Sequence, residues 1–423
     1  MFYETATSQG LEGVSMPDTK IDLTISSEIA PLKTILLKRP GKELCNLTPN
    51  NLEELLFDDI PYLENAQKEH DVFANILRQQ GVEVLYLEDL AGEVLDNQIL
   101  KAEIINTFLG LSGIRNVNIV DGLRAYLSQY SGKELCQQLM SGLKRNEIKL
   151  SDMGLSTQIA RKDDFWLHPI PNLYFTRDPG VVFGNMACLN SMYAETRRRE
   201  SIFIESVLKH HSRFSRNLTL DLRLNHGSIE GGDIIVLDKN TLAIGVSQRT
   251  SAQAIEQLSH QLFFDDRLKT SHTIKKILAF KIPVSRAFMH LDTVLTQIDY
   301  DKVTMHRGIV HKTTIYRLSA GDSQTVKCDE LTGDIGKILS EELSREIEII
   351  YCGGEDTITG SREQWSDGAN TLALRPGEVF VYQRNAATNR LLQEKGIKVY
   401  EIPCSELSRG RGGATLYVDA TRA

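Results

Sequence analysis

The chain has 423 residues, of which 41% are hydrophobic and 25% are charged, and its formal net charge at neutral pH is -8. A chain of this length can bury a large core in one large domain or two smaller ones. The acidic balance argues against a nucleic-acid-binding protein, because no dominant basic field exists to displace counterions from phosphates.

No apolar run reaches the roughly 18 residues that a membrane span requires. The first 20 residues are polar and lack the apolar segment of a secretory signal, so we expect residues 1–24 to form a loose tail. Six cysteines are scattered without paired spacing, which favours a reducing cytoplasm over a disulfide framework or a zinc site; they are Cys45, Cys136, Cys188, Cys328, Cys352 and Cys404.

In chain order, the apolar density of residues 31–39 predicts a buried strand that stops at Pro40 and Gly41. A helical pattern opens at Thr48 and continues to Gln80, where Gly81 is a typical helix end. Residues 82–87 then predict a second strand. This order is typical of a βαβ unit with short parallel strands.

From about residue 89 to residue 156 helical periodicity dominates, which predicts a helical insertion of roughly 70 residues. Short strands with glycine-rich turns return after it, and a helix over residues 251–262 lies among them. These segments predict an α/β body. The predicted strands are 180–184, 233–237, 241–246, 275–280, 346–354, 371–382 and 397–403.

Four short motifs carry side chains suited to chemistry: PNLYFTRDP (171–179), IEGGD (229–233), MHLDT (289–293) and RGRGG (409–413). Each one alone has an ordinary structural explanation. An aspartate before a proline is usually a turn residue, an acidic residue beside two glycines is usually a turn or cap residue, and a histidine after apolar residues usually lies in the core. Arginines between glycines suit a flexible surface.

Taken together, these motifs suit the binding and protonation of a planar cation. Asp178 and Asp292 could each accept two parallel charge-assisted hydrogen bonds from a guanidinium group. His290, oriented by Glu230, would be a general acid and base, an arrangement that typically contributes about 10²- to 10⁴-fold to a rate.

The motifs resemble those of bacterial arginine deiminases, which belong to the guanidine-modifying pentein superfamily. The resemblance runs from Ala30 to Gly413 through long blocks in one order: ILLKRPGKEL (35–44), LLFDDIPYLENAQKEHDVFA (55–74), NLYFTRDP (172–179), ETRRRE (195–200), IEGGD (229–233), SQRTSAQAI (247–255), MHLDTVLTQIDYDK (289–302), REQWSDGANTL (362–372) and SRGRGG (408–413). It implies a catalytic domain over 25–423, an α/β propeller of about five ββαβ units. The helical insertion, at about 89–160, fits this architecture.

The resemblance also implies a reaction, in which L-arginine and water give L-citrulline and ammonia without a metal or a cofactor. A cysteine thiolate attacks the guanidinium carbon, which Asp178 and Asp292 hold by its nitrogens. His290, oriented by Glu230, protonates the departing ammonia and then activates water. The implied ligands of the α-carboxylate and its surroundings are Asn172, Arg249, Arg411 and one arginine of the 197–199 run, with Arg197 and Arg198 as candidates. We also expect a homo-oligomer.

The nucleophile of that reaction is missing from this sequence. The terminal loop of the family reads R-G-R-G-G-x-R-C-M-S-M-P, and here Thr415 and Leu416 replace the R-C pair. A leucine cannot attack carbon, so covalent catalysis has no starting group at this position. Cys404 is twelve residues upstream, too far to take its place without rebuilding the loop.

A shift of reading frame accounts for the unusual ending. Residues 415–423 can be encoded by ACG TTG TAT GTC GAT GCC ACT CGT GCG. Without the first base, the same letters encode R-C-M-S-M-P-L-V-R, which is the ending of the family. If the next bases were TGA, the present frame would stop after Ala423. We therefore predict a frameshift in preference to gradual divergence.

Three functions stay open at this point. The leading one is an arginine deiminase with an intact scaffold and a frameshifted terminus. The second is a non-catalytic protein that binds arginine or citrulline in a guanidine pocket. The third is a related amidinotransferase, which the deiminase blocks disfavour. Turnover of free arginine separates the enzyme from the binder.

Overall fold

The computed structural model describes residues 19–150, 155, 159, 164–412 and 418–422. Within this part of the chain, five sheets share one pattern, in which two antiparallel strands are followed, after a helix, by a third strand parallel to the second. Four of these units lie in sequence order. Their strands are β5 Gly180–Phe183, β6 Met186–Leu189 and β7 Leu218–Asp221; β8 Ile234–Asp238, β9 Thr241–Val246 and β10 Lys276–Lys281; β11 Leu295–Asp299, β12 Lys302–Met305 and β15 Glu348–Tyr351; β16 Leu372–Arg375, β17 Glu378–Tyr382 and β18 Lys398–Ile402.

The fifth unit joins the two ends of the chain. β1 (Leu32–Leu37) pairs in parallel with β2 (Glu83–Tyr86) and antiparallel with the C-terminal β19 (Val418–Arg422). Arg422 is 1% exposed and donates hydrogen bonds to the carbonyl oxygens of Ala30 and Ala373, at 2.7 and 2.8 Å. The C-terminal strand therefore closes the set of units.

The remaining strands extend or accompany these units. A hairpin of β13 (Thr314–Ala320) and β14 (Val326–Leu331) adds to the edge of the sheet that contains β10. The short strands β3 (Leu143–Lys144) and β4 (Phe165–Leu167) form a separate pair.

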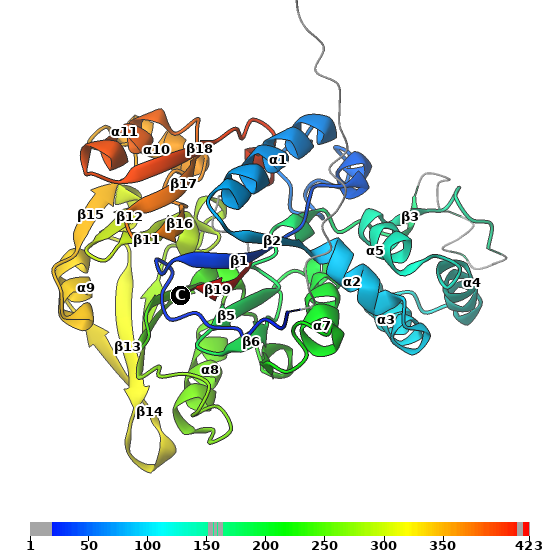
Figure 1. Cartoon of the computed structure of the whole chain (residues 1–423), viewed down its shortest axis with the longest axis horizontal. Helices are drawn as coiled ribbons and strands as arrows, with labels where there is room; N and C mark the ends of the chain where they lie inside the picture. The colour runs from blue at the N-terminus through cyan, green and yellow to red at the C-terminus, as the bar shows by residue number, and fades with distance from the viewer. Residues whose placement is uncertain (1–18, 151–154, 156–158, 160–163, 413–417, 423) are drawn as a thin grey trace, which may run out of the picture.

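The helices of the five units lie at the periphery, outside the strands (Figure 1). α1 shows why: Ala66, Phe73 and Leu77 recur on one face and are buried, and Phe73 meets the ring of Phe380 edge-on at 5.3 Å. The helices of the units are α1 Leu63–Gln79, α7 Glu200–His210, α8 Ala252–Phe264, α9 Ile335–Leu343 and α11 Ala386–Glu394, and α10 Thr357–Trp365 precedes β16.

Four further helices lie together at one side of the molecule (Figure 1). They are α2 Leu87–Leu95, α3 Gln98–Leu111, α4 Val117–Leu127 and α5 Gly132–Ser141. The side chain of Ser131 caps α5, and Glu134 completes the capping box. Gly142, with φ of 81°, ends α5, because a left-handed residue cannot continue a right-handed helix. α5 therefore ends at Ser141.

Two expectations from the sequence are wrong in detail. The predicted helix over residues 48–62 is a series of turns, and α1 begins only at Leu63, because Leu56 has a left-handed φ of 62°. The loose tail does not extend to residue 24. Ile21 and Leu23 are buried, and the backbone N–H of Ile21 donates to the carbonyl of Arg213. Residues 1–18 lie outside the described residues.

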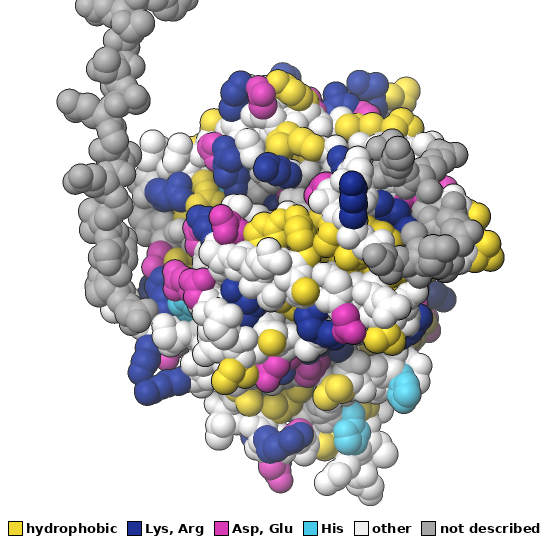
Figure 2. Space-filling model, turned by 90° about the vertical axis from the view of Figure 1, so that its right-hand side faces the viewer, with side chains coloured by type: hydrophobic (Ala, Val, Ile, Leu, Met, Phe, Trp, Pro, Cys, Tyr) yellow, Lys and Arg dark blue, Asp and Glu magenta, His cyan; other side chains and the backbone are white. Residues whose placement is uncertain are grey.

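On the face that Figure 2 shows, Lys and Arg side chains are scattered among Asp and Glu rather than gathered into one basic surface. Apolar side chains lie between them, and α3 and α4 expose Ile99 and Val117, which are 72% and 68% accessible. In the described ranges, no helix is both long enough and apolar enough to cross a membrane.

Candidate functional site

The turns that lead into the first strands of three units bring three predicted side chains together. Asp178 precedes β5, Glu230 precedes β8 and His290 precedes β11. Since these units repeat one connection, the turns occupy equivalent places and face the same central region. All three side chains are buried, with 2%, 0% and 3% of the residue exposed.

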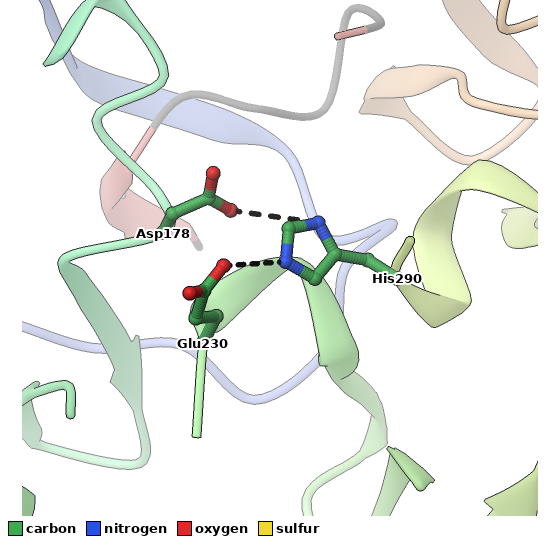
Figure 3. A group of neighbouring side chains, drawn as sticks. All are labelled: Asp178, Glu230 and His290. Atoms are coloured by element: carbon green, nitrogen blue, oxygen red, sulfur yellow. Dashed lines mark hydrogen bonds and ion pairs between the residues drawn. The ribbon is translucent and has the colours of Figure 1, made fainter. Parts of the chain in front are cut away.

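His290 lies between the two carboxylates (Figure 3). Its Nε2 is 2.8 Å from Oε2 of Glu230, and its Nδ1 is 3.9 Å from Oδ1 of Asp178. The second oxygen of Glu230, Oε1, accepts a hydrogen bond from the backbone N–H of Tyr193 at 2.9 Å. Both oxygens of Glu230 are therefore used to orient the imidazole.

These contacts decide the protonation state of the pair. Burial alone lowers the pKa of His290, but the carboxylates of Asp178 and Glu230 raise it more, to about 9. Burial alone raises the pKa of Glu230, but His290, Arg197 and Arg249 bring it down to about 2. At neutral pH the pair is therefore an imidazolium beside a carboxylate, with a proton ready to donate.

Asp233 was not among the predicted site residues, yet it holds the turn that carries His290. Its Oδ1 accepts from the backbone N–H of Leu291 at 2.8 Å, and its Oδ2 accepts from the hydroxyl of Ser247 at 2.6 Å. Burial raises the pKa of Asp233 to about 6. The IEGGD block therefore supplies both the partner of His290 and the support of its turn.

The arginine run separates into one residue inside the site and two outside it. Arg197 is buried, and its Nη1 donates to Oδ2 of Asp178 at 2.9 Å. Arg198 is on the surface, with 52% of its side chain exposed, and pairs with Glu195 at 3.2 Å. Arg199 donates to the carbonyl of His168. Arg198 is therefore not a site residue, because neighbours in a tight helical turn point in different directions.

A small cavity of about 20 Å³ lies against this group, roughly the space of one water molecule. Leu56 is one of the residues that line it, and the side chain of Asn172 donates to the carbonyl of Leu55 at 2.7 Å and so holds that turn. Arginine is much larger than one water, so these segments must move to admit it. The polar residues that line the cavity are Asn172, Asp178, Arg197, Arg249, His290 and Arg411.

Arg249 is a lining cation with hydrogen-bonding capacity to spare. It is 3% exposed, and within the described part of the chain its Nε and Nη1 have no hydrogen-bond partner. Its Nη2 is 3.7 Å from the sulfur of Met289, and the Tyr193 ring is 5.8 Å away. Such a guanidinium suits an anionic group of a ligand, which would satisfy two donors at once.

Arg411 also lines the cavity and lies in the terminal loop that the sequence singled out. Its guanidinium lies 3.6 Å above the Trp365 ring, and its Nη1 is 3.7 Å from Asp58. Arg411 has a left-handed φ of 60°, a conformation that costs roughly 1–3 kcal/mol for a residue other than glycine. Burial lowers the pKa of Arg411.

Asp292 lies on the same turn as His290 but borders a different cavity. This second cavity, of about 10 Å³, is also lined by Glu28 and Arg177. Burial raises the pKa of Asp292 to about 7. The structure thus places the two predicted guanidinium carboxylates, Asp178 and Asp292, on neighbouring cavities rather than on one. Thr415 and Leu416 lie outside the described residues.

Asp178, Glu230 and His290 are also the one group, among the residues described, whose ligand atoms could hold a metal ion, all within 4.8 Å of one another. Arg197 works against that use, because its Nη1 is 2.9 Å from Asp178 and 3.7 Å from Glu230. A metal cation there would face a buried guanidinium and a protonated imidazole.

The comparisons with known proteins agree with this geometry. The family model for arginine deiminase matches residues 53–416. The chain is 46% identical to the arginine deiminase of Clostridium perfringens over 403 residues, which cover 92% of this chain and 95% of that protein. It is 48% identical to the arginine deiminase of Bacillus cytotoxicus over 404 residues, which cover 93% and 97%.

Among solved structures, the fold resembles SxtG, an amidinotransferase from Microseira wollei, with a TM-score of 0.54 at 14% identity over 95% of this chain and 97% of that one. That likeness concerns the fold alone, and it confirms the α/β fold of ββαβ units expected from the sequence. The predicted family is confirmed by the sequence relatives, and the chain belongs to the arginine deiminase family.

Proposed function

We propose that this chain binds L-arginine in the cavity between Asp178, His290 and Arg249, and that its scaffold is built to hydrolyse arginine to citrulline and ammonia. The observation that carries this proposal is the imidazolium of His290, held between two carboxylates beside a buried arginine with donors to spare. Because Leu416 stands at the position of the nucleophile, the chain as given binds arginine without turning it over.

The ligand would be held at both ends. In the part of the structure that is described, Oδ1 of Asp178 is buried and has no hydrogen-bond partner, so it can accept from a guanidinium N–H. Asp292 would bind the guanidinium from the neighbouring cavity once the segments move. Arg249 would bind the α-carboxylate, because its planar fork matches a carboxylate.

With a thiolate restored at position 416, the reaction would run in two steps. The sulfur attacks the guanidinium carbon, a C–S bond forms, and the C–N bond breaks as His290 gives its proton to the leaving ammonia. The neutral imidazole then takes a proton from water. The resulting hydroxide attacks the same carbon, the C–S bond breaks to regenerate the thiolate, the hydroxyl proton passes to solvent, and citrulline leaves. Glu230 stays ionised throughout and stabilises the imidazolium.

The runner-up function is a binder without catalytic activity, favoured by Leu416 together with the preserved cavity residues. The two functions share one ligand site and differ only in turnover. An amidinotransferase has no support beyond the fold. The predictions of a homo-oligomer, a cytoplasmic location, a catalytic domain over 25–423, and no nucleic acid, membrane, metal or cofactor partner stay predictions.

Calorimetric titration of the chain with L-arginine tests the proposed site. We expect Arg249→Lys to weaken arginine binding at least about tenfold, since a hydrogen bond to a charged group contributes roughly 1.5–3 kcal/mol and a lysine cannot make the paired contact. The control is Arg267→Lys, at an exposed arginine that pairs with Asp265. Arginine binding that is equally tight in Arg249→Lys would remove Arg249 from the site.

Arginine affinity should also depend on pH below about 7. The pKa of Asp292 is raised to about 7, and a bound guanidinium favours its ionised form. Affinity should therefore be constant above pH 7 and fall by up to about tenfold per pH unit below it, with a proton released on binding. Titrations in buffers of different ionisation enthalpy count that proton. In Asp292→Asn the dependence should become weaker, and a dependence of unchanged size would assign it to another buried carboxyl, such as Glu200, whose pKa burial raises to about 7.

A further inference from the structure

Glu200 is the first residue of α7 and lies behind the cavity wall without lining the cavity. It is 1% exposed, and both of its oxygens contact Arg197. Nε of Arg197 is 3.0 Å from Oε1 of Glu200, and Nη2 is 2.8 Å from Oε2. This paired contact fixes the plane of the guanidinium group.

The opposite edge of the same guanidinium faces the site. Nη1 of Arg197 donates to Oδ2 of Asp178 at 2.9 Å and lies 3.7 Å from Oε2 of Glu230. Nη2 is 3.5 Å from the carbonyl oxygen of Asn172. Arg197 therefore contacts Asp178 through a single hydrogen bond, and Oδ1 of Asp178 keeps no hydrogen-bond partner among the described residues.

We propose that Glu200 is a positioning residue that makes the site selective for a cationic guanidinium over a neutral ligand. It holds Arg197 by one edge, so that Arg197 can take only one oxygen of Asp178 and the other stays available. Its negative charge also offsets the charge of Arg197 in a buried region, where charges interact strongly. This inference rests on the proposed function, because it assumes that arginine binds at Asp178.

Removing the charge of Glu200 should weaken the binding of L-arginine in two ways. The guanidinium of Arg197 would be free to turn and bind both oxygens of Asp178. The cavity would also gain one positive charge. Both effects oppose L-arginine, whose guanidinium is a cation. The added positive charge does not oppose L-citrulline, whose ureido group is neutral and of similar shape, so arginine loses more affinity than citrulline. The expected change is therefore in the preference between the two ligands.

The test is calorimetric titration of the full chain with L-arginine and with L-citrulline. Glu200→Gln should weaken arginine binding about tenfold or more and change citrulline binding by less than about threefold. The matched control is Glu205→Gln on the same helix, where the glutamate pairs with Lys209 and Arg223. It makes the same change of charge away from the cavity, and it should leave the preference for arginine intact.

Equal weakening of both ligands in Glu200→Gln, or no change in either, would overturn the inference. If Glu200→Gln does not fold, Glu200→Asp decides, because it keeps the charge but is one methylene too short to hold both nitrogens of Arg197. Glu200→Asp should lose part of the preference for arginine, and an unchanged preference would overturn the inference. A parent chain that binds neither ligand would instead overturn the proposed function, on which this inference depends.

Discussion

A chain in which residues 415–423 are replaced by R-C-M-S-M-P-L-V-R should produce citrulline steadily, whereas the chain as given should produce none. The restored thiol would belong to the loop of Arg411 and react beside the imidazolium of His290, and nearby cations favour the reactive thiolate. We expect turnover on the order of 1 s⁻¹ or faster, as in ordinary enzymes. A colorimetric citrulline assay measures it. Leu416→Cys alone should recover less, because its neighbours would still be foreign to the loop.

The matched control carries the same ending with serine in place of the cysteine and should be inactive. Citrulline production by the unmodified chain would show that Leu416 does not disable it. Cys404 is poorly suited to replace the missing thiol, since it lines another cavity, of about 770 Å³, and burial raises its pKa to about 11. The frameshift itself is decided by sequencing the source gene, where an uninterrupted frame would refute it.

In the chain with the restored ending, His290→Asn should lower kcat by about 10²- to 10⁴-fold, because the departing ammonia loses its proton donor and water loses its base. Arginine binding should change much less than kcat, since His290 does not hold the guanidinium. Steady-state rates together with calorimetric binding separate the two effects.

His211 provides the control for that substitution. It is 4% exposed and follows α7, and its Nε2 is 2.8 Å from Oε2 of Glu93 in α2. It therefore forms a second histidine–glutamate pair, outside the candidate site. His211→Asn should leave kcat unchanged. An equal loss of kcat in both variants would point to damage of the fold rather than to a proton transfer by His290.

Local sequence patterns predicted part of the regular structure. The predicted strand over residues 371–382 is two strands, β16 and β17, and β11 and β12 were not predicted. The strands predicted over residues 31–39 and 82–87 are correct to within two residues at every end, and Gly81, with φ of 81°, ends the first helix region as expected. The same reasoning failed over residues 48–62. There Leu55 and Phe57 are buried, as the pattern suggests, but Ile60 is exposed. The segment forms turns because the backbone at Leu56 is left-handed, and a hydrophobic pattern does not report φ.

The residues of the candidate site also fall into those that the sequence identified and those that it did not. Asp178, Glu230 and His290 could be named from the motifs because their side-chain chemistry is specific, and the structure brings them together. The sequence offered no means of choosing between Arg197 and Arg198. That choice depends on which side chain of a tight turn faces the interior, and the burial of one and the exposure of the other decide it.

Glu200 and Asp233 were missed for a related reason. Both lie inside recognised blocks, ETRRRE and IEGGD, but their contacts are with Arg197 and with the turn after His290, groups that only the fold places beside them. The amino-acid sequence of a motif does not distinguish a carboxylate that contacts the ligand from one that orients another residue.

The sequence by itself determined the family, the chemical types of the site residues and the leucine at position 416, because these are properties of single positions and short motifs. Only the tertiary structure decided which oxygen of Asp178 is available, that Asp292 borders a second cavity, and that Arg422 closes the first sheet. Those properties arise where distant segments meet, and the free energy of each contact depends on burial and on neighbouring charges that no local pattern contains.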